Sequence, residues 1–386
     1  MIPYGRQEID EDDIAAVSAA LRRPMLTQGP LVEEFEARLA KQLGAKYAVA
    51  VNSGTSALHA AYFAADIGPD KSVLIPPITF VATGNASLYL GGGVEFVDVD
   101  DAAPLMTPKT LAAAGSKKVR ALVPVHMCGH VCDMEGLSAV ARERGWIVIE
   151  DAAHALGAKY GKKNKSQWTV GACQHSDLCV FSFHPVKHIT TGEGGAVTTN
   201  DRILYERLKL FRSHGITRDP SVMKRNDGAW YYEQHALGFN YRITDFQCAL
   251  GLSQIERLAD FLDRRRKIAE RYDRAFSFDS EVKPILMPAW SESVYHLYVI
   301  RVPAEKRLKI FNGMRSAGIG VNLHYIPVYQ QPYYRENGFM GYSLPNAERY
   351  YSEAITIPMY PGLTDAEVDF VVEEVFRHLG RPRTVA

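Results

Sequence analysis

The sequence predicts an α/β protein, with a large domain built on a mostly parallel sheet and a smaller C-terminal α+β domain. Short apolar runs alternate with segments of helical periodicity as far as about residue 244. Such runs are typical of parallel strands that helices cover on both faces. The pattern then changes to long helices with few strands, so we predict a large domain at 1–250 and a small domain at 251–386. A chain of 386 residues with 47% hydrophobic content is long enough for a large core.

The first part of the chain supplies the elements of this sheet. A helix is expected over 11–22, with Asp10 as its N-cap and with Ile14, Val17 and Leu21 at helical spacing. A second helix over 32–43 should stop at Gly44. Five runs predict buried strands, at 47–51, 73–75, 120–126, 146–150 and 178–183.

The C-terminal part has a different texture. A periodic apolar set from Thr244 to Phe276 predicts one long helix that connects the domains. The DRRRK run at 263–267 is interpreted as the solvated face of this helix. Apolar runs at 296–302 and 318–325 and a terminal helix at 365–379 complete the expected small domain.

Composition limits the class of protein. Lys and Arg total 44, as do Asp and Glu, and this zero net charge argues against nucleic acid or an anionic membrane surface as a partner. No apolar run reaches the length of a membrane span, and the acidic start lacks the apolar region of a signal peptide. An odd set of five cysteines indicates reduced thiols, so we expect a cytoplasmic enzyme.

One lysine stands out in the stretch SDLCVFSFHPVKHITTGEGG. Lys187 follows an apolar strand, lies between two histidines and precedes a glycine-rich turn. An isolated lysine there is most often a surface amine, but a lysine can also form a Schiff base with a carbonyl. That chemistry needs a phosphate site, a carboxylate for a pyridinium nitrogen and a flat side chain to stack on a ring.

Each of these partners has a candidate. Asn52 to Ser56 join a strand to a helix, where backbone N–H groups can bind a phosphate, and Ser182 can add a hydroxyl. Asp151 follows a strand and Phe80 follows another. Taken singly, these residues have simpler interpretations as a strand–helix turn, a helix cap and core packing. Their joint occurrence favours a site for pyridoxal 5'-phosphate.

Four stretches carry a resemblance to a known family. SFHPVKHITTGEGG, EDAAHALG, NSGTSAL and LGFNYRITDFQCALG resemble the DegT/DnrJ/EryC1/StrS sugar aminotransferases, and the resemblance covers essentially the whole chain. It implies the aspartate aminotransferase-like fold, known as fold type I, with pyridoxal 5'-phosphate as cofactor. Members of this family transfer amino groups to nucleotide-linked sugars.

The resemblance also implies roles for matching residues. Lys187 would be the Schiff-base lysine, Asp151 the partner of the pyridine nitrogen and His154 a neighbour of the ring's 3-hydroxyl. Other cofactor contacts would be Phe80 on the ring, Gly54, Thr55 and Ser182 on the phosphate, and Asn240 on the phosphate of the neighbouring subunit. The enzyme would therefore be a homodimer with shared active sites. Residues in substrate-contacting segments would be Tyr4, Pro24, Met25, Leu26, Thr27, His324, Tyr325, Ile326 and Pro327.

Further stretches point to one substrate class. LTQGP (26–30), residues 173–187, 210–219 and 233–245, and HYIPVYQQPYY (324–334) resemble family members with a particular reaction. Those enzymes aminate C4 of a UDP-linked 4-keto-6-deoxy-N-acetyl hexose with L-glutamate as donor. The alternatives are a C4 aminotransferase with a bacillosamine- or perosamine-type product, a sugar dehydratase, or a non-catalytic binding protein. Lys187 speaks against the dehydratase, because related dehydratases carry His at that position.

Two other segments leave alternatives open. His126, Cys128, His130 and Cys132 alternate as metal ligands in a strand do, but Gly129 indicates a turn. We therefore favour a loop at a strand end near the active site, with no metal. The polar stretch 161–172 is interpreted as a surface insertion.

Overall fold

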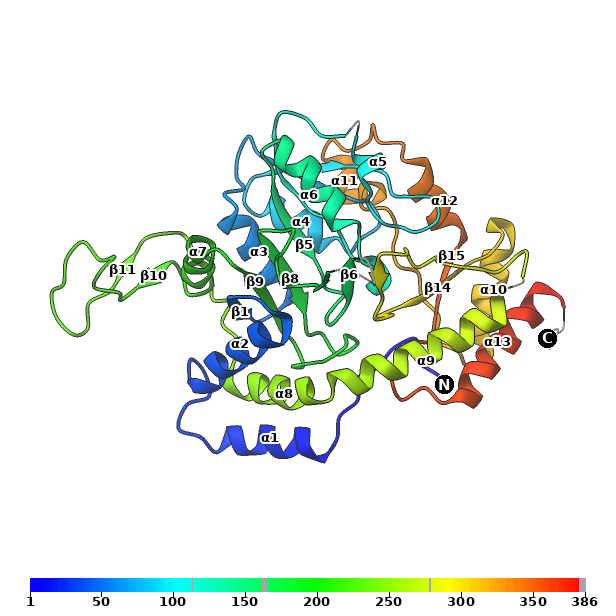
Figure 1. Ribbon diagram of the computed structural model, residues 1–386, viewed down its shortest axis with the longest axis horizontal. Coiled ribbons are helices and arrows are strands. Elements are labelled where there is room, and N and C mark those ends of the chain that lie inside the picture. Colours follow the sequence, from blue (N-terminus) through cyan, green and yellow to red (C-terminus); the bar gives the residue numbers. More distant parts are fainter. Residues whose placement is uncertain (113, 162–165, 278, 382–386) are drawn as a thin grey trace.

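The computed structural model describes residues 1–112, 114–161, 166–277 and 279–381 (Figure 1). Its largest sheet has the strand order β1-β9-β8-β5-β4-β2-β3. All neighbouring pairs are parallel except those of β9, which runs antiparallel to both β1 and β8. The predicted mostly parallel sheet is confirmed. Its strands are β1 (Tyr47–Val51), β2 (Ser72–Ile75), β3 (Gly93–Phe96), β4 (Val119–Leu122), β5 (Ile147–Asp151), β8 (Leu178–Ser182) and β9 (Gly195–Thr199).

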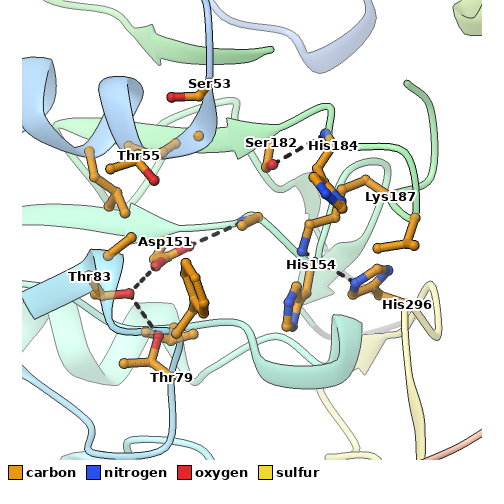
Figure 2. Close-up of a pocket in the computed structure, with 18 of the residues that line it drawn as sticks. Ser53, Thr55, Thr79, Thr83, Asp151, His154, Ser182, His184, Lys187 and His296 are labelled. Carbon is orange, nitrogen blue, oxygen red and sulfur yellow. Dashed lines mark hydrogen bonds between the residues drawn. The ribbon is translucent and has the colours of Figure 1, made fainter. Parts of the chain in front are cut away.

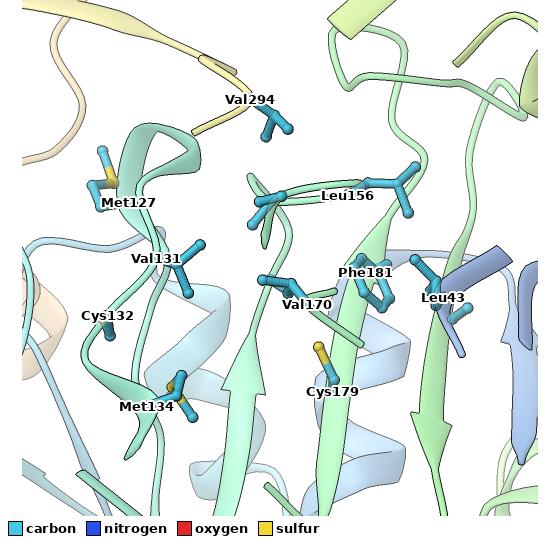
Figure 3. Close-up of a cluster of buried hydrophobic side chains, with 14 of the residues drawn as sticks. Leu43, Met127, Val131, Cys132, Met134, Leu156, Val170, Cys179, Phe181 and Val294 are labelled. Atoms are coloured by element: carbon cyan, nitrogen blue, oxygen red, sulfur yellow. The ribbon is translucent and has the colours of Figure 1, made fainter. Parts of the chain in front are cut away.

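Both faces of this sheet are buried. Along β1, Ala48 and Ala50 belong to one apolar cluster and Val49 and Val51 to another, as alternation along a strand requires. Figure 3 shows part of the first cluster, in which Phe181 of β8 lies beside Leu43. The helices of this part are α1 (Glu11–Leu21), α2 (Pro30–Leu43), α3 (Gly54–Ala64), α4 (Ala82–Leu88), α5 (Pro108–Leu111), α6 (Met134–Glu143) and α7 (Arg202–Arg212).

The predicted start of the first helix after Asp10 and the predicted stop of the second at Gly44 are confirmed, whereas α2 begins at Pro30 rather than at residue 32, and the orientation of α1 was not foreseen. Asp10 caps α1 and accepts from the Asp13 backbone N–H, and Gly44 ends α2 at φ 79°. Ile14 and Leu21 are 50% and 53% exposed. The buried side of α1 instead carries Asp13, which accepts a 2.6 Å hydrogen bond from Gln254.

The single long helix expected from Thr244 to Phe276 is wrong in one respect, because the chain forms two helices. α8 (Asp245–Glu256) and α9 (Leu258–Phe276) are separated at Arg257, whose φ and ψ are −99° and 2°. The Arg257 side chain turns back to pair with Asp10 at 2.8 Å and with Asp13. The predicted boundary near residue 250 falls within α8 and stays a prediction.

The C-terminal part has its own sheet and core. Strands β12 (Lys283–Pro284), β14 (Tyr298–Arg301) and β15 (Ala354–Ile357) pack against α9, α10 (Ala304–Ser316) and α13 (Asp365–Leu379). The predicted terminal helix is confirmed, whereas 318–325 is an extended segment that makes isolated bridges rather than a strand. The shorter helices are α11 (Pro332–Glu336), α12 (Pro345–Glu353) and the 3-10 turns η1 (Met127–Gly129) and η2 (Val328–Gln330).

Two minor sheets complete the fold. β6 (Lys159–Gly161) pairs with β7 (Gln167–Thr169) and β13 (Ser291–Glu292), so the predicted insertion at 161–172 includes β7, while 162–165 lie outside the described residues. β10 (Ile216–Thr217) and β11 (Glu233–Gln234) form an arm that projects from the body beyond α7 (Figure 1). Within the described ranges, no helix is long and apolar enough to cross a membrane.

Candidate active site

A cavity of about 840 Å³ opens where the carboxyl ends of β1, β5 and β8 meet (Figure 2). Open α/β sheets typically bind ligands at this edge. Of the predicted site residues, those that line the cavity are Tyr4, Gly54, Thr55, Phe80, Asp151, His154, Ser182, Lys187, His324 and Tyr325. The chain thus gathers residues from six separate segments around one space.

The amine of Lys187 lies inside this cavity. Its Nζ is 3.3 Å from Nε2 of His296. Burial and the charge of Arg265 together lower the pKa of Lys187 to about 7, although the charge of Asp151 raises it. A lysine with this pKa is largely unprotonated above neutral pH and can act as a nucleophile.

Asp151 presents a buried carboxylate across the cavity from Lys187. Its Oδ2 accepts a 2.7 Å hydrogen bond from the Thr83 hydroxyl, and its Oδ1 accepts from the Ala153 N–H at 3.2 Å. Burial raises the pKa of Asp151, although both hydrogen bonds and the charge of Lys187 lower it. Lys187 supplies positive charge near this carboxylate. A ligand with a cationic N–H group, bound in the cavity, would supply that charge instead.

His154 stands beside the lysine and is kept neutral. Its ring centroid is 4.3 Å from that of His296, and its Nε2 is 3.4 Å from the Tyr325 hydroxyl. Burial and the charge of Lys187 hold the pKa of His154 well below its usual value. Its Nδ1 is buried without a hydrogen-bond partner among the described residues.

The other end of the cavity contains the N-terminus of α3. Gly54 begins α3, and the first N–H groups of a helix have no partner within it. A Cβ on Gly54 would lie 3.0 Å from the Ser182 hydroxyl oxygen, so glycine leaves the space between them open. The helix N-terminus, the Thr55 side chain and Ser182 therefore fit a phosphate group. Together with Asp151 and Lys187, these residues fit pyridoxal 5'-phosphate.

Phe80 also faces this space. It is 57% exposed, and its ring centroid lies 6.1 Å from that of Tyr325. An aromatic side chain this exposed has surface available to a ligand ring. Stacking on the cofactor stays a prediction.

Several predicted residues do not reach the cavity of their own chain. Pro24, Met25, Leu26 and Thr27 are exposed, and Leu26 accepts a backbone hydrogen bond from Asp245 at 3.0 Å. Asn240 is exposed, but its backbone oxygen is 3.4 Å from the side chain of Asn52, which lines the cavity. Ile326 is 39% exposed and Pro327 is buried, and neither lines the cavity.

Sequence reasoning missed three residues that support the site. The Thr79 and Thr83 hydroxyls are 2.7 Å apart, and Thr83 continues to Asp151. Their signal was the stretch PPITFVATG, from which Phe80 alone was selected. His296 begins HLYVIRV, where its polar character at the start of a strand was a signal that the apolar pattern masked.

The HMCGHVC stretch forms a loop at a strand end, as predicted from Gly129, which has φ 90°. His126 Nε2 lies 2.7 Å from Glu150, and the Cys132 thiol donates to the Val125 carbonyl at 3.3 Å. Among the residues that the structure describes, no three His, Cys, Asp or Glu side chains are placed to hold a metal ion.

The fold and the site define a pyridoxal phosphate-dependent aminotransferase of fold type I. Residues 7–376 match the DegT/DnrJ/EryC1/StrS aminotransferase family, and the chain belongs to this family. Solved structures of similar proteins include one with the pyridoxal form of the cofactor and one with its pyridoxamine form. The predicted family, fold class and cofactor are confirmed.

Three similar proteins carry informative names. The chain is 36% identical to the spore coat polysaccharide biosynthesis protein SpsC of Bacillus subtilis. The match covers 97% of this chain and 96% of SpsC. It is 38% identical to the UDP-4-amino-4,6-dideoxy-N-acetyl-beta-L-altrosamine transaminase of Campylobacter jejuni, with 97% of each chain covered. The solved structure of PseC, an aminotransferase of pseudaminic acid biosynthesis from Helicobacter pylori, matches with a TM-score of 0.89 and 30% sequence identity. The match covers 98% of this chain and 99% of PseC.

Proposed function

We propose that this enzyme transfers the amino group of L-glutamate to C4 of UDP-2-acetamido-2,6-dideoxy-β-L-arabino-hexos-4-ulose, a step of pseudaminic acid biosynthesis. The observation that carries this proposal is the 38% identity to the Campylobacter altrosamine transaminase, sustained over 97% of both chains. The structural similarity to PseC, a protein of the same pathway, also supports the proposal. The five cysteines are free thiols and all are buried, which suits an enzyme that works in the cytoplasm.

The residues of the site suit this chemistry. When bound, pyridoxal phosphate supplies a carbonyl carbon that carries the amino group and a ring that accepts electrons. Lys187 attaches the cofactor and, once free, moves a proton through its Nζ as general base and acid. Its pKa of about 7 allows the amine both to take and to release a proton near neutral pH.

Asp151 would hold a proton on the pyridine nitrogen, and the positive charge kept there would strengthen the ring as an electron sink. Thr83 fixes the orientation of this carboxylate through its 2.7 Å hydrogen bond. His154 would bind the ring's 3-hydroxyl, and Phe80 would stack on the ring. Gly54, Thr55 and Ser182 bind the phosphate at the N-terminus of α3.

The remaining predicted residues suit an active site shared by two subunits. Asn240 and Pro24 to Thr27 are exposed on their own chain, and Asn240 forms an isolated bridge with Ser213, which follows α7. Met25 and Leu26 expose apolar surface, as do Ile14 and Leu21 on α1. In a homodimer with closed symmetry, such a surface is buried and Asn240 reaches the phosphate of the neighbouring cofactor. Tyr4, the 24–27 segment and the 324–327 segment then contact the sugar nucleotide.

A panel of UDP-linked 4-keto sugars with L-glutamate tests the proposed substrate. We expect turnover with the β-L-arabino 4-ketose and formation of 2-oxoglutarate in equal amount. The similarity to SpsC supports a second candidate, a different C4-aminated sugar of a surface polysaccharide. Preferred turnover of the D-xylo 4-ketose, which leads to bacillosamine-type products, would contradict the first proposal and favour this second one.

A further inference from the structure

A histidine from the C-terminal part of the chain touches the reactive amine. His296 Nε2 lies 3.3 Å from Lys187 Nζ, and the two residues are 109 positions apart in the sequence. In Figure 2, His296 approaches Lys187 from a different segment of the chain than the one that carries the lysine. The steps described above give this imidazole no role.

The backbone of His296 is held in place by a buried arginine. Nη1 of Arg265 donates to the carbonyls of His296 and Tyr295, each at 3.2 Å, and to that of Met359 at 3.0 Å. The prediction that the whole DRRRK run is a solvated face is therefore wrong at Arg265, which is 1% exposed. A buried guanidinium needs acceptors, and these three carbonyls fix the His296 segment to α9.

The surroundings of His296 keep its ring uncharged. Burial together with Lys187, His154, His188 and Arg265 holds the pKa of His296 well below its usual value. The ring centroids of His154 and His188 lie 4.3 and 5.4 Å from that of His296. A neutral imidazole nitrogen can accept a hydrogen bond from an ammonium group without taking its proton.

We propose that His296 is a catalytic residue that accepts a hydrogen bond from the ammonium form of the free Lys187 and thereby aims and stabilises it. This deepens the proposed function and rests on it. A proton would pass from the donor carbon to Nζ of Lys187, and the electron pair left behind would pass into the cofactor ring. The proton would stay on Nζ as an N–H bond while His296 accepts the hydrogen bond, and would then pass from Nζ to the cofactor carbon that carries the amino group. No charge moves to His296, and Arg265 acts as a positioning residue through the backbone.

One consequence is measurable without substrate. Loss of the acceptor disfavours the ammonium form, so the pKa of the Lys187 amine falls. Asp151 and Arg265, the other charged groups that act on this amine, are unchanged in a His296 variant. Losing a hydrogen bond from its charged form should lower the pKa of the amine by about one unit or more.

The experiment measures how fast an amine-reactive acylating reagent modifies Lys187 of the cofactor-free, full-length protein at different pH values, by peptide mass spectrometry. His296→Phe should lower the midpoint by about one unit. His296→Gln, whose amide oxygen can reach the place of Nε2, should stay near wild type, and His296→Asn, which is shorter, should behave like the Phe variant. The Gln and Asn pair keeps the test valid if the Phe variant fails to fold.

His130→Phe is the matched control. His130 is also buried with its pKa lowered to about 4, and it packs against Tyr295 rather than Lys187. It should leave the midpoint unchanged. Equal midpoints in the wild type, His296→Asn and His296→Gln proteins, or an equal shift in His130→Phe, would overturn the proposal.

A second readout uses the complete enzyme. His296→Asn should lower kcat about tenfold with little change in KM for the sugar, and His296→Gln should restore part of it. Because the labelling midpoint involves neither sugar nor cofactor, it stands even if the proposed substrate is wrong. A KM effect without a kcat effect would contradict a role at the lysine.

Discussion

The Thr83 hydroxyl donates a 2.7 Å hydrogen bond to Oδ2 of Asp151, and both side chains are buried beneath the cavity. This bond lowers the pKa of Asp151, whereas burial raises it. Thr83 thus helps to keep Asp151 a carboxylate, which is the form that can hold a proton on a pyridine nitrogen. A threonine that never needs to touch the substrate therefore supports the electron sink.

Thr83→Val should shift the pH dependence of kcat. Loss of the hydroxyl raises the pKa of Asp151 further, so the carboxylate becomes protonated at a higher pH. The acidic limb of the kcat–pH profile therefore moves to higher pH. Thr79→Val is the control, because the Thr79 hydroxyl bonds to Thr83 at 2.7 Å and reaches Asp151 only through it. The control should shift the limb less. Equal limbs in wild type and Thr83→Val, measured from pH 5 to 9, would mean that this bond is not important.

Asp151→Asn should reduce the rate by several orders of magnitude, on the order of 4 kcal/mol or more in the barrier, because the ring nitrogen loses its proton. Single-turnover rates with glutamate measure this directly. A loss under tenfold would indicate that Asp151 serves only to cap the turn after β5.

The same substitution should not destabilise the cofactor-free protein at neutral pH. Burial raises the folded-state pKa of Asp151 above its ordinary 3.8, so the carboxylate costs folding stability once the pH exceeds that range. Asn removes the charge. We expect a melting temperature at pH 7 equal to or above that of wild type, with the advantage disappearing below about pH 4. A clear loss at pH 7 would contradict this sign.

Lys187→Ala should abolish turnover while the fold survives. The lysine pKa of about 7 makes the amine largely neutral at pH 8, so its removal at that pH takes little positive charge away from the buried Asp151. Circular dichroism should match wild type, and the visible absorbance of the covalently held cofactor should disappear. Lys159→Ala, at an exposed position of β6, is the control and should keep both. Normal transaminase rates in Lys187→Ala would overturn the assignment of the lysine.

Gly54→Ala should weaken cofactor binding at least tenfold. The added Cβ would lie 2.9 Å from Cβ and 3.0 Å from Oγ of Ser182, so it narrows the space proposed for the phosphate. Gly341→Ala is the control, since nothing lies within 4 Å of a Cβ there. Equilibrium titration with pyridoxal phosphate checks both variants. Equal dissociation constants would move the phosphate site away from Gly54.

Much of the large sheet could be predicted because both of its faces are buried. A strand buried on both faces is apolar at nearly every position, so it stands out as a continuous apolar run. Strands β3 and β9 were missed. GAVTT of β9 lacks bulky residues, and its antiparallel direction follows from the return of the chain after β8 through residues 183–194. The break at Arg257 and the burial of Arg265 were also missed. Both depend on distant partners, such as Asp13 and the Met359 carbonyl, that a local pattern does not contain.

The site shows the same division. Asp151 and Ser182 end strands of the sheet and Lys187 follows one of them, so position relative to a strand identified them. Thr83 and His296 act through side-chain geometry that forms only when separate segments meet. Asn240 was selected by resemblance alone, and its proposed role depends on a second chain.

The last prediction concerns that second chain. Asn240→Ala should weaken cofactor retention if Asn240 binds the phosphate in the neighbouring subunit. Mixing it with Lys187→Ala gives heterodimers in which one site carries both defects and the other carries none. Activity should reappear, up to roughly half of wild type per mixed dimer. Asp151→Asn mixed with Lys187→Ala is the control and should stay inactive, because both residues line the cavity of their own chain. If the Asn240 mixture stays inactive after subunit exchange is demonstrated by mass, Asn240 serves its own chain's cofactor or none.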